Sequence, residues 1–310
     1  MIRYIGKRLL TMIPILLVVA ILIFCLMDFV PGDPVQIMMG DSATPAQIEE
    51  ARERLGLNDP FVVRLGNYLW DLLHLDFGKS YIFGMAVGPE LLSRFPRTLT
   101  LALLCVGASV VIGVPIGISC AMNANKPIDR IWMFLTLLGN SMPGFWLALM
   151  LVILVSLRWG LLPSNGIGSW EYYVLPVIAN SLGSFASIAR QTRSSMLEVI
   201  RQDYIRTARS KGLAERKVYF KHMLKNGLIP IITGIGARLA RLLGGSMIVE
   251  NVFSIPGMGV LARTAVMSKD VPLIQAIVLL TSMVACLAFI LTDIAYTVVD
   301  PRITLTESHD

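Results

Sequence analysis

Charged residues are scarce in this chain of 310 residues. Lys, Arg, Asp and Glu make up 15% of it and hydrophobic residues 55%, whereas about a quarter of the residues of a soluble domain are charged. Histidine is also rare: there are three, His74, His222 and His309, and none lies in an apolar run. A site for a first-row transition metal inside the apolar part of the chain is therefore not expected.

The motifs of several enzyme classes are missing too. No Gly-x4-Gly-Lys-Ser/Thr is present, which excludes an ATP site of the P-loop type, and neither His-Glu-x-x-His nor Gly-x-Ser-x-Gly occurs. Asp28 and Asp293 are poor candidates for an intramembrane aspartyl protease, because both lie near the ends of apolar runs with no recognisable motif around them. The four cysteines lie in apolar runs without metal-ligand spacing, which is typical of reduced core residues. We therefore expect no catalytic residue and no metal site.

Long apolar runs are what the chain has in abundance. Five carry no charge and a sixth is interrupted by two arginines; they cover residues 9–27, 98–125, 131–157, 172–189, 271–292 and, with the arginines, 226–249. A helix needs about 20 apolar residues to cross a bilayer, where the backbone has to satisfy its own hydrogen bonds. The runs predict an all-α membrane protein with six transmembrane helices. The first run lacks a small-residue cleavage site after it, which favours an anchor helix over a signal peptide.

The basic residues indicate an orientation. Residues 190–225 contain ten Lys or Arg and three acidic residues, and Arg3, Lys7 and Arg8 precede the first run. Lys and Arg in short loops mark the cytoplasmic side of a membrane protein. We therefore expect this basic segment and both termini in the cytoplasm, and residues 31–97, with six basic and nine acidic residues, on the other side.

The basic segment is predicted to fold. Ser195 and Glu198 fit a capping box for a helix over residues 196–211, Gly212 would end it, and a second short helix would reach Gly227. Two such helices would suit either a rigid docking protrusion or an amphipathic element that binds anionic lipid headgroups. The residues alone favour neither interpretation.

Proline and glycine within the apolar runs predict breaks and close contacts. Pro115 is expected to break the second membrane helix, and Pro143 with Gly144 the third. Gly113 and Gly117 form a small-xxx-small pair, which lets another helix approach closely.

The segment 31–97 is predicted to hold two small helices. Thr44 followed by Pro45 is a good helix start. The stretch FVVRLGNYLWDLLHL (61–75) has the pattern of an amphipathic helix.

Arg238 and Arg241 are unusual because they interrupt an apolar run. At 1.5 Å per residue, Arg238 would lie about 18 Å beyond Asn226, and the i,i+3 spacing places both arginines on one helix face. Charges at such depth are costly and usually face a partner or a cavity. The partner could be Asp293, Glu250 or another subunit; alternatively, the arginines line a route that attracts carboxylates and repels a bare divalent cation.

Short motifs recur along almost the whole chain, in a fixed order. They are VPGDP (30–34), RLGLNDP (54–60), HLDFGKSY (74–81), FPRTLTLAL (95–103), SMPGFWLALML (141–151), LLPSNG (161–166), GGSMIVENVFSIPGMG (244–259), KDVPLIQA (269–276) and VVDPRI (298–303). Taken together over residues 2–303, they resemble the dipeptide, oligopeptide and nickel branch of ABC importer permeases. The segment 203–230 resembles the cytoplasmic Glu-Ala-Ala loop of that family, although Arg206, Thr207 and Ala208 stand at the position of those three residues.

The resemblance implies a type I ABC importer permease fold, with a cytoplasmic coupling helix and a small extracytoplasmic helical insert. Residues 1–97 would hold the first transmembrane helix and the insert, and residues 98–310 a permease core with five transmembrane helices and the coupling loop 190–225. The element that docks on a cytoplasmic ATPase would consist of Asp203, Tyr204, Arg206, Ala208, Arg209 and Gly212.

The resemblance also implies partners and a location. The partners are a second homologous permease subunit, two cytoplasmic subunits that hold ATP and magnesium, an extracytoplasmic solute-binding protein and membrane lipid, but no nucleic acid. The location is the cytoplasmic (inner) membrane of a bacterium. This chain itself is expected to be neither an enzyme nor the holder of a cofactor.

The cargo implied by the resemblance is di- or oligopeptides, moved inward. Nickel, a metal chelate and a glutathione-type anion remain alternatives. An ATP-independent channel is the alternative from a different functional class, and it would conduct without the ATPases.

Overall fold

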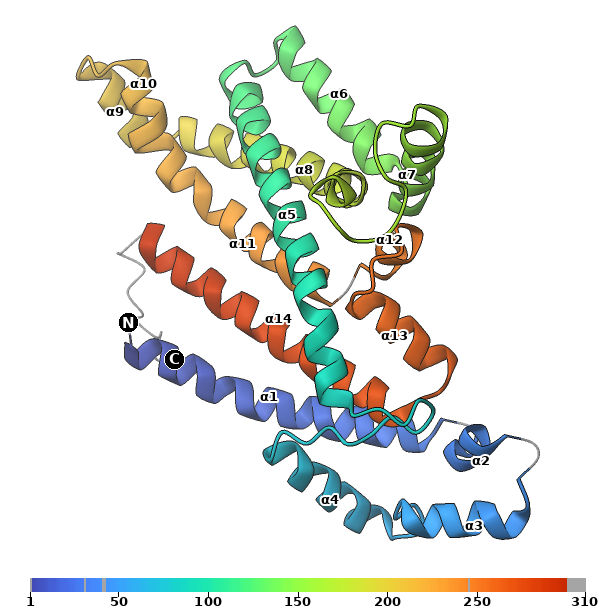
Figure 1. The fold of residues 1–310 in the computed structure, drawn as a ribbon. Coiled ribbons are helices and arrows are strands. Elements are labelled where there is room, and N and C mark those ends of the chain that lie inside the picture. Colours follow the sequence, from blue (N-terminus) through green and yellow to red (C-terminus); the bar gives the residue numbers. More distant parts are fainter. Residues whose placement is uncertain (1, 31, 41–42, 245, 300–310) are drawn as a thin grey trace. The chain divides into compact units, whose positions relative to one another are not determined.

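The computed structural model describes residues 2–30, 32–40, 43–244 and 246–299, and its regular elements are helices (Figure 1). The only β-type feature in these residues is an isolated bridge between Lys79 and Ala86. The all-α fold predicted from the apolar runs is therefore confirmed.

Four helices in the described ranges are long and apolar enough to cross a membrane, namely α1 (Ile2–Asp28), α5 (Val87–Met122), α8 (Glu171–Ile200) and α14 (Val271–Val299). There is a fifth span if α6 (Pro127–Ser141) is counted together with α7 (Gly144–Leu151) and η1 (Val152–Arg158), which are bent by 92° relative to it. The sixth predicted run forms α11 (Leu224–Leu243) and α12 (Met247–Val252). It is not counted as a span because two arginines lower the hydropathy of α11.

The two proline predictions have different outcomes. At Pro143 the chain bends between α6 and α7, as predicted, with Met142 and Pro143 in extended conformations. The break predicted at Pro115 is wrong, because α5 continues through this residue to Met122. Proline is tolerated inside membrane helices where neighbouring groups satisfy the carbonyl that it leaves without a donor.

The chain forms two compact units, each made of two stretches. Unit 1 consists of Met1–Thr98 and Pro256–Val284, and unit 2 of Leu99–Ile255 and Ala285–Asp310. The first stretch of unit 1 ends at Thr98. The sequence did not indicate that α13 (Met258–Met267) and the beginning of α14 belong to the same unit.

The predicted insert lies in unit 1 and contains α2 (Pro34–Met39), α3 (Pro45–Arg54) and α4 (Phe61–Leu73). Thr44 and Gln47 form a capping box at the start of α3, which confirms the predicted helix start. The predicted amphipathic helix is α4, and its Val62, Trp70 and Leu73 side chains are exposed.

Aromatic and buried polar contacts hold the other parts of unit 1 together. The Phe24 ring of α1 lies 5.5 Å from that of Phe61 and 5.2 Å from that of Tyr68, both in α4. The buried Asp270 carboxylate, just before α14, accepts hydrogen bonds from the Ser80 hydroxyl and the Tyr81 N–H. The segment between α4 and α5 is thereby fixed to the start of α14.

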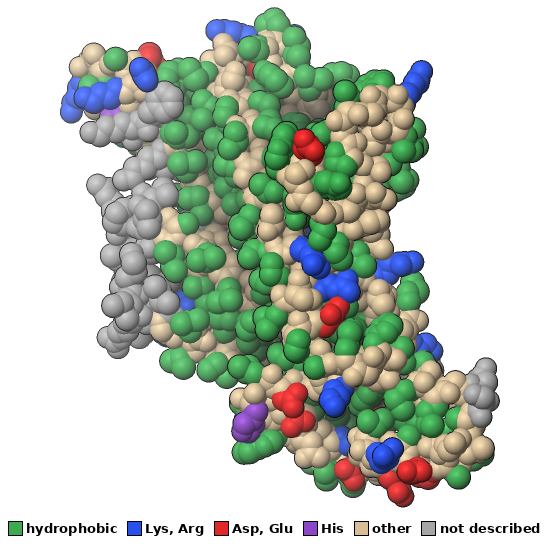
Figure 2. Space-filling model, in the orientation of Figure 1, with side chains coloured by type: hydrophobic (Ala, Val, Ile, Leu, Met, Phe, Trp, Pro, Cys, Tyr) green, Lys and Arg blue, Asp and Glu red, His purple; other side chains and the backbone are tan. Residues whose placement is uncertain are grey.

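In unit 2, α8 packs against α6, α7 and α11. A Cβ atom on Gly113 of α5 would lie 2.7 Å from the Phe185 carbonyl oxygen of α8, and one on Gly117 would lie 2.5 Å from that of Ala189. The predicted close helix contact at this glycine pair is therefore confirmed. The outer faces of the long helices are largely apolar (Figure 2), as bilayer exposure requires, and exposed examples are Leu10, Leu26, Val111 and Leu291.

Candidate functional sites

The basic segment after α8 folds into a short helical element. α8 ends at Ile200, and α9 (Asp203–Ser210) follows after two residues. Next, α10 (Glu215–Lys217) and the π-helical η2 (Val218–Met223) lead without a break into α11. The segment therefore joins two long helices of unit 2 directly.

Two local predictions for this segment are wrong. Ser195 and Glu198 form no capping box, because both lie inside α8 and the buried Ser195 hydroxyl donates to the Gly227 carbonyl oxygen, 2.9 Å away, on α11. The second short helix does not end at Gly227, because the chain stays helical through it. Gly227 lies instead where α11 crosses α8: a Cβ atom there would be 2.9 Å from the Met196 sulfur.

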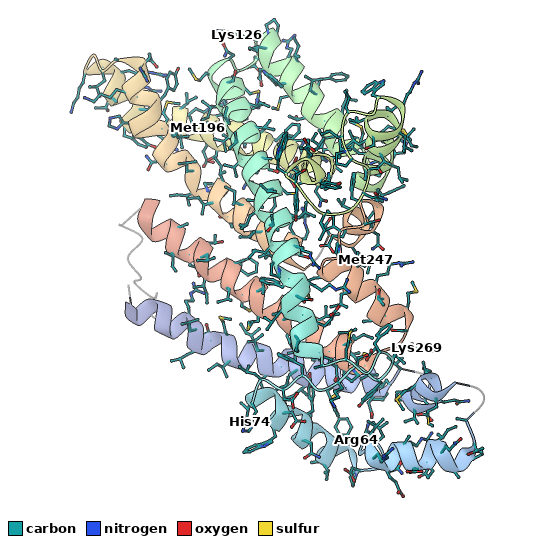
Figure 3. The ribbon with its side chains drawn as sticks, viewed as in Figure 1. Arg64, His74, Lys126, Met196, Met247 and Lys269 are labelled. Carbon is teal, nitrogen blue, oxygen red and sulfur yellow. The ribbon has the colours of Figure 1, made fainter. Side chains whose placement is uncertain are left out.

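α9 has one buried face. Ile205 and Ala208 point into a core that also contains Met196 of α8 and Val218 and Met223 of η2. Figure 3 labels Met196 on α8. This core fixes α9 both to the end of α8 and to the helix that continues into α11.

The other face of α9 is exposed and charged. The side chains of Asp203 and Arg206 are 97% and 82% exposed, and 3.8 Å separates their charged atoms. Tyr204 is also exposed, and its hydroxyl oxygen accepts a hydrogen bond from Asn226 Nδ2 at 2.9 Å. Figure 2 shows basic side chains gathered over α9 and α10.

The turn after α9 is closed by an ion pair and a glycine. Arg209 Nε lies 2.9 Å from Glu215 Oε1, and the hydrogen bond and charge of Glu215 raise the pKa of Arg209 above its usual value. Gly212 has φ +71°, a conformation that other L residues adopt at a cost. A Cβ atom at Gly212 would meet no atom within 4 Å, so its requirement is conformational rather than steric.

The structure thus brings the six predicted docking residues together in α9 and its following turn. Five of them lie on the surface or shape the turn. Ala208 is buried, so it packs α9 against the core and cannot contact a docking partner directly.

A second site is formed by arginines of α8 and α11. Arg238 is half-buried, and its Nη1 atom is buried without a hydrogen-bond partner in the described part of the chain. The charged groups near enough to act on it are Arg241, on the next turn of α11, and Arg190 of α8. We call Arg190, Arg238 and Arg241 the arginine cluster.

The predicted alternative partners do not neutralise this cluster. Among the residues that the structure describes, neither Arg238 nor Arg241 forms an ion pair, with Asp293, with Glu250 or with any other acidic residue. A partner on another subunit remains open. Arg238 therefore carries a charge in an apolar helix without a counter-charge from the described residues, which is costly.

Arg190 was not predicted, because it follows an apolar run directly and was counted with the basic loop. α8 continues past it to Ile200, so Arg190 lies inside a long helix. Its Nη1 donates to the Thr136 carbonyl oxygen at 3.5 Å. Arg190 lies ten residues before the end of α8. A prediction that placed the end of this helix at Ile200 would have identified Arg190 as a charged residue inside a long helix.

Glycines let α11 approach its neighbours closely. A Cβ atom on Gly234 would lie 2.5 Å from Gln191 Oε1 of α8, and one on Gly236 would collide with Thr292 of α14. The helix that carries Arg238 and Arg241 is therefore wedged between α8 and the end of α14 within unit 2.

A buried ion pair, also missed from the sequence, ties the α5–α6 turn to α8. Arg193 Nε lies 2.7 Å from Asp129 Oδ1, and the Asp129 side chain is 3% exposed. Asp129 Oδ2 also accepts the Asn125 N–H at 2.9 Å. Asp129 belongs to α6 and Arg193 to the last third of α8, shortly before α9.

No group of His, Cys, Asp or Glu residues in the described ranges has a geometry that could hold a metal ion. His74 follows α4 and His222 lies in η2, both outside the candidate spans. His309 lies outside the described residues.

Comparison with known proteins decides the family. The family described as binding-protein-dependent transport system inner membrane component matches residues 113–305, and the family of the N-terminal part of such membrane components matches residues 1–102. The chain belongs to this family of permease subunits.

Relatives of the permease cover almost its whole length. It is 40% identical over 305 residues to a putative peptide transport system permease protein of Brucella abortus (strain 2308), which covers 96% of this chain and 97% of that protein. It is also 40% identical over 303 residues to the glutathione transport system permease protein GsiC of Salmonella typhi, covering 98% and 99%.

A solved structure agrees with the fold. A chain of the methionine ABC transporter MetNI, in an inward-facing conformation, superposes with a TM-score of 0.56 at 18% identity, covering 67% of this chain and 95% of that one. The permease therefore has the type I ABC importer fold. It is a multi-pass inner-membrane subunit and not an enzyme, because the ATPase of such importers is a separate subunit.

Proposed function

We propose that this permease moves di- or oligopeptides inward across the membrane, driven by ATP hydrolysis on its partners. Support comes from the relatives that are named for peptide transport and for glutathione transport, at the same identity of 40%. Glutathione is itself a small peptide with free carboxylates, so both names agree on the chemistry of the cargo. Peptides are the main candidate, and glutathione is the second.

The observation that carries the cargo class is the arginine cluster. Arg190, Arg238 and Arg241 bring three positive charges to neighbouring apolar helices without a carboxylate of the described chain beside Arg238. A cargo carboxylate supplies the missing counter-charge and accepts the hydrogen bonds of a guanidinium, which is well shaped for that group. We assign the cluster to the translocation route, where it attracts peptides, glutathione or an anionic chelate and repels bare nickel.

We further assign the exposed face of α9 to docking on the ATPases. Asp203, Tyr204, Arg206, Arg209 and the turn at Gly212 form the surface, and Ala208 supports it. The element is folded onto the ends of α8 and η2, so a displacement of α9 is passed to the two helices that bear the arginine cluster. This connection is what a coupling element requires.

The assembly that fits these assignments has four further components. We propose a second homologous permease subunit, two cytoplasmic ATPase subunits that bind ATP with magnesium, and a solute-binding protein outside. Both termini then lie in the cytoplasm, on the side of α9.

Uptake measurements test this proposal. In cells that lack the gene, uptake of a labelled dipeptide should return when the gene is restored, and should stop when ATP is depleted. Labelled glutathione and radioactive nickel are the parallel arms. Return of nickel uptake alone contradicts the peptide assignment, and uptake that continues without ATP indicates a channel.

A further inference from the structure

Unit 1 contains a cavity that neither the coupling element nor the arginine cluster uses. Its volume is about 620 Å³, within the range of about 300–1,000 Å³ that is common for small-molecule sites. Its walls are formed by the ends of α1 and α3, by α2 and α4, by the segments that follow α3 and α4, and by the start of α14. By the predicted orientation, it lies on the extracytoplasmic side.

Two hydrogen-bond donors at this cavity have no acceptor. Arg64 Nε and the Tyr68 hydroxyl both belong to residues that line the cavity, and both atoms are buried without a hydrogen-bond partner in the described part of unit 1. A buried donor without an acceptor is rare and costly. The two residues are four apart on α4, and hence on the same face of the helix.

Contacts with α1 hold the side chains of Arg64 and Tyr68 in position. Arg64 Nη2 lies 2.7 Å from Asp28 Oδ1 at the end of α1, which leaves Nε for another acceptor. The Tyr68 ring stacks on Phe24, with 5.2 Å between the ring centroids. Figure 3 labels Arg64 on α4. Two hydrogen-bond donors that are held in position and lack an acceptor are suited to bind an anionic oxygen.

An acceptor lies further along the same face. Asp71 also lines the cavity, is exposed, and forms no ion pair or side-chain hydrogen bond with any described residue. Asp71 is seven residues after Arg64, so the two backbone positions are about 10.5 Å apart along the helix. The row Arg64, Tyr68 and Asp71 therefore presents a site for an anion and a site for a cation, separated by the length of a small molecule.

We propose that this cavity binds the zwitterionic form of a short peptide, with its carboxylate at Arg64 and Tyr68 and its ammonium group at Asp71. The inference rests on the proposed function, and it adds a site outside the translocation route where the permease itself holds the cargo. A phosphoethanolamine headgroup carries the same two charges. Its phosphate and ammonium are only two carbon atoms apart, so a headgroup with its ammonium at Asp71 would reach Tyr68, about 4.5 Å away along the helix, and not Arg64.

The test measures binding of labelled trialanine to the full-length permease in nanodiscs of phosphatidylglycerol. Tyr68→Phe and Asp71→Asn should each weaken binding by about tenfold or more. Tyr172→Phe and Asp59→Asn are the matched controls, because neither residue lines the cavity, and both should bind as the unchanged protein does. Tyr68→Phe keeps the ring on Phe24 and removes a hydroxyl without a partner, so the thermal midpoint should not fall.

Blocked peptides identify which end binds where. N-acetyl-trialanine should bind weakly and should no longer respond to Asp71→Asn, and trialanine amide should no longer respond to Tyr68→Phe. Equal binding of all three peptides, or unchanged binding by both variants, overturns the proposal. If phosphatidylethanolamine in the nanodiscs abolishes trialanine binding, the occupant is the lipid headgroup and the peptide assignment is wrong.

Uptake by cells separates this inference from the proposed function. If cells with both substitutions take up trialanine at the normal rate and affinity, the site is wrong and the transport function stands. If the gene restores no peptide uptake while the purified permease binds trialanine through Tyr68 and Asp71, the site stands and the proposed transport of peptides fails.

Discussion

Two arginine-rich regions of unit 2 differ in what lies beside their charges. In α9 and its turn, Arg206 lies 3.8 Å from Asp203 and Arg209 lies 2.9 Å from Glu215, and both arginines are exposed to solvent. In α8 and α11, Arg190, Arg238 and Arg241 have no acidic partner among the described residues. Arginine is thus paired with a carboxylate in the first region and has no acidic partner among the described residues in the second.

The difference has a physical consequence. An exposed ion pair contributes little to stability, so the charges of α9 can be exchanged at little cost to the fold. An unpaired charge in an apolar helix costs free energy until something from outside neutralises it. Surface recognition suits the first region, and binding of an anionic cargo suits the second.

The largest effect should come from reversing the charges of α9. The double substitution Asp203→Lys with Arg206→Glu preserves the i,i+3 pair within the helix but inverts the surface that we assign to the ATPases. We expect ATP-dependent uptake to fall to the background level, while the amount of permease in the membrane stays normal. Labelled-peptide uptake and immunoblotting of membranes measure the two.

A matched control exists on the same predicted side of the membrane. Arg130→Glu changes an exposed charge at the start of α6, away from α9, and should leave uptake unchanged. Normal uptake by the α9 double variant would show that this surface does not dock on the ATPases.

The next largest effect should be on stability, at the buried pair of Asp129 and Arg193. Asp129→Ala leaves the Arg193 guanidinium without its partner at 2.7 Å. Arg193 is 26% exposed, so the cost should lie between the roughly 0.2–1 kcal/mol of an exposed pair and the roughly 3–5 kcal/mol of a fully buried one. The thermal midpoint of the purified permease should fall clearly. A change comparable to that of an exposed pair would mean that solvent reaches the site and that the pair does not hold the α5–α6 turn on α8.

Sequence patterns predicted the elements better than their ends. The bend at Pro143 and the cap at Thr44 follow from local rules, and both are found. Of the six apolar runs, four form candidate spans in the described ranges and a fifth forms the bent pair of α6 with α7 and η1, whereas the run with two arginines does not. The capping box at Ser195 failed because a neighbouring helix supplies an acceptor at Gly227, which no local rule contains.

The sites show the same limit. Asp203 to Gly212 are close in sequence, so a motif could group them. Arg190 joins Arg238 only because α8 packs on α11, and Arg193 meets Asp129 across 64 positions. The row of Arg64, Tyr68 and Asp71 was present in an amphipathic pattern, but the lack of partners that distinguishes it is visible only in three dimensions.

Arg238→Met should separate cargo binding from stability in the unpaired region. Loss of a hydrogen bond to a charged group costs about 1.5–3 kcal/mol, so the affinity for a peptide with a free C-terminal carboxylate should fall by about tenfold to a hundredfold. The same variant, without cargo, should be as stable as the unchanged permease or more so, because it removes a repelling charge and a buried Nη1 without a partner. Concentration-dependent uptake and thermal unfolding measure the two.

C-terminally amidated peptides provide the control for this variant. Their uptake should be low already and should change little on Arg238→Met. A marked loss of stability, together with loss of the protein from the membrane, would instead indicate that another subunit supplies a structural partner for Arg238.

The smallest effect should be found at the ion pair of Arg209 and Glu215. This arginine has an acidic partner, whereas Arg238 has none among the described residues. Both side chains are partly exposed, at 39% and 54%, and exposed pairs contribute about 0.2–1 kcal/mol. A double-mutant cycle with Arg209→Ala and Glu215→Ala, followed by thermal unfolding, should therefore give a coupling within that range, and salt should reduce it further because the pair is open to solvent. A coupling of several kcal/mol would mean that the ion pair fixes the turn at Gly212. The charges of α9 could then not be exchanged without cost to the fold, and the two arginine-rich regions would differ only in where they lie.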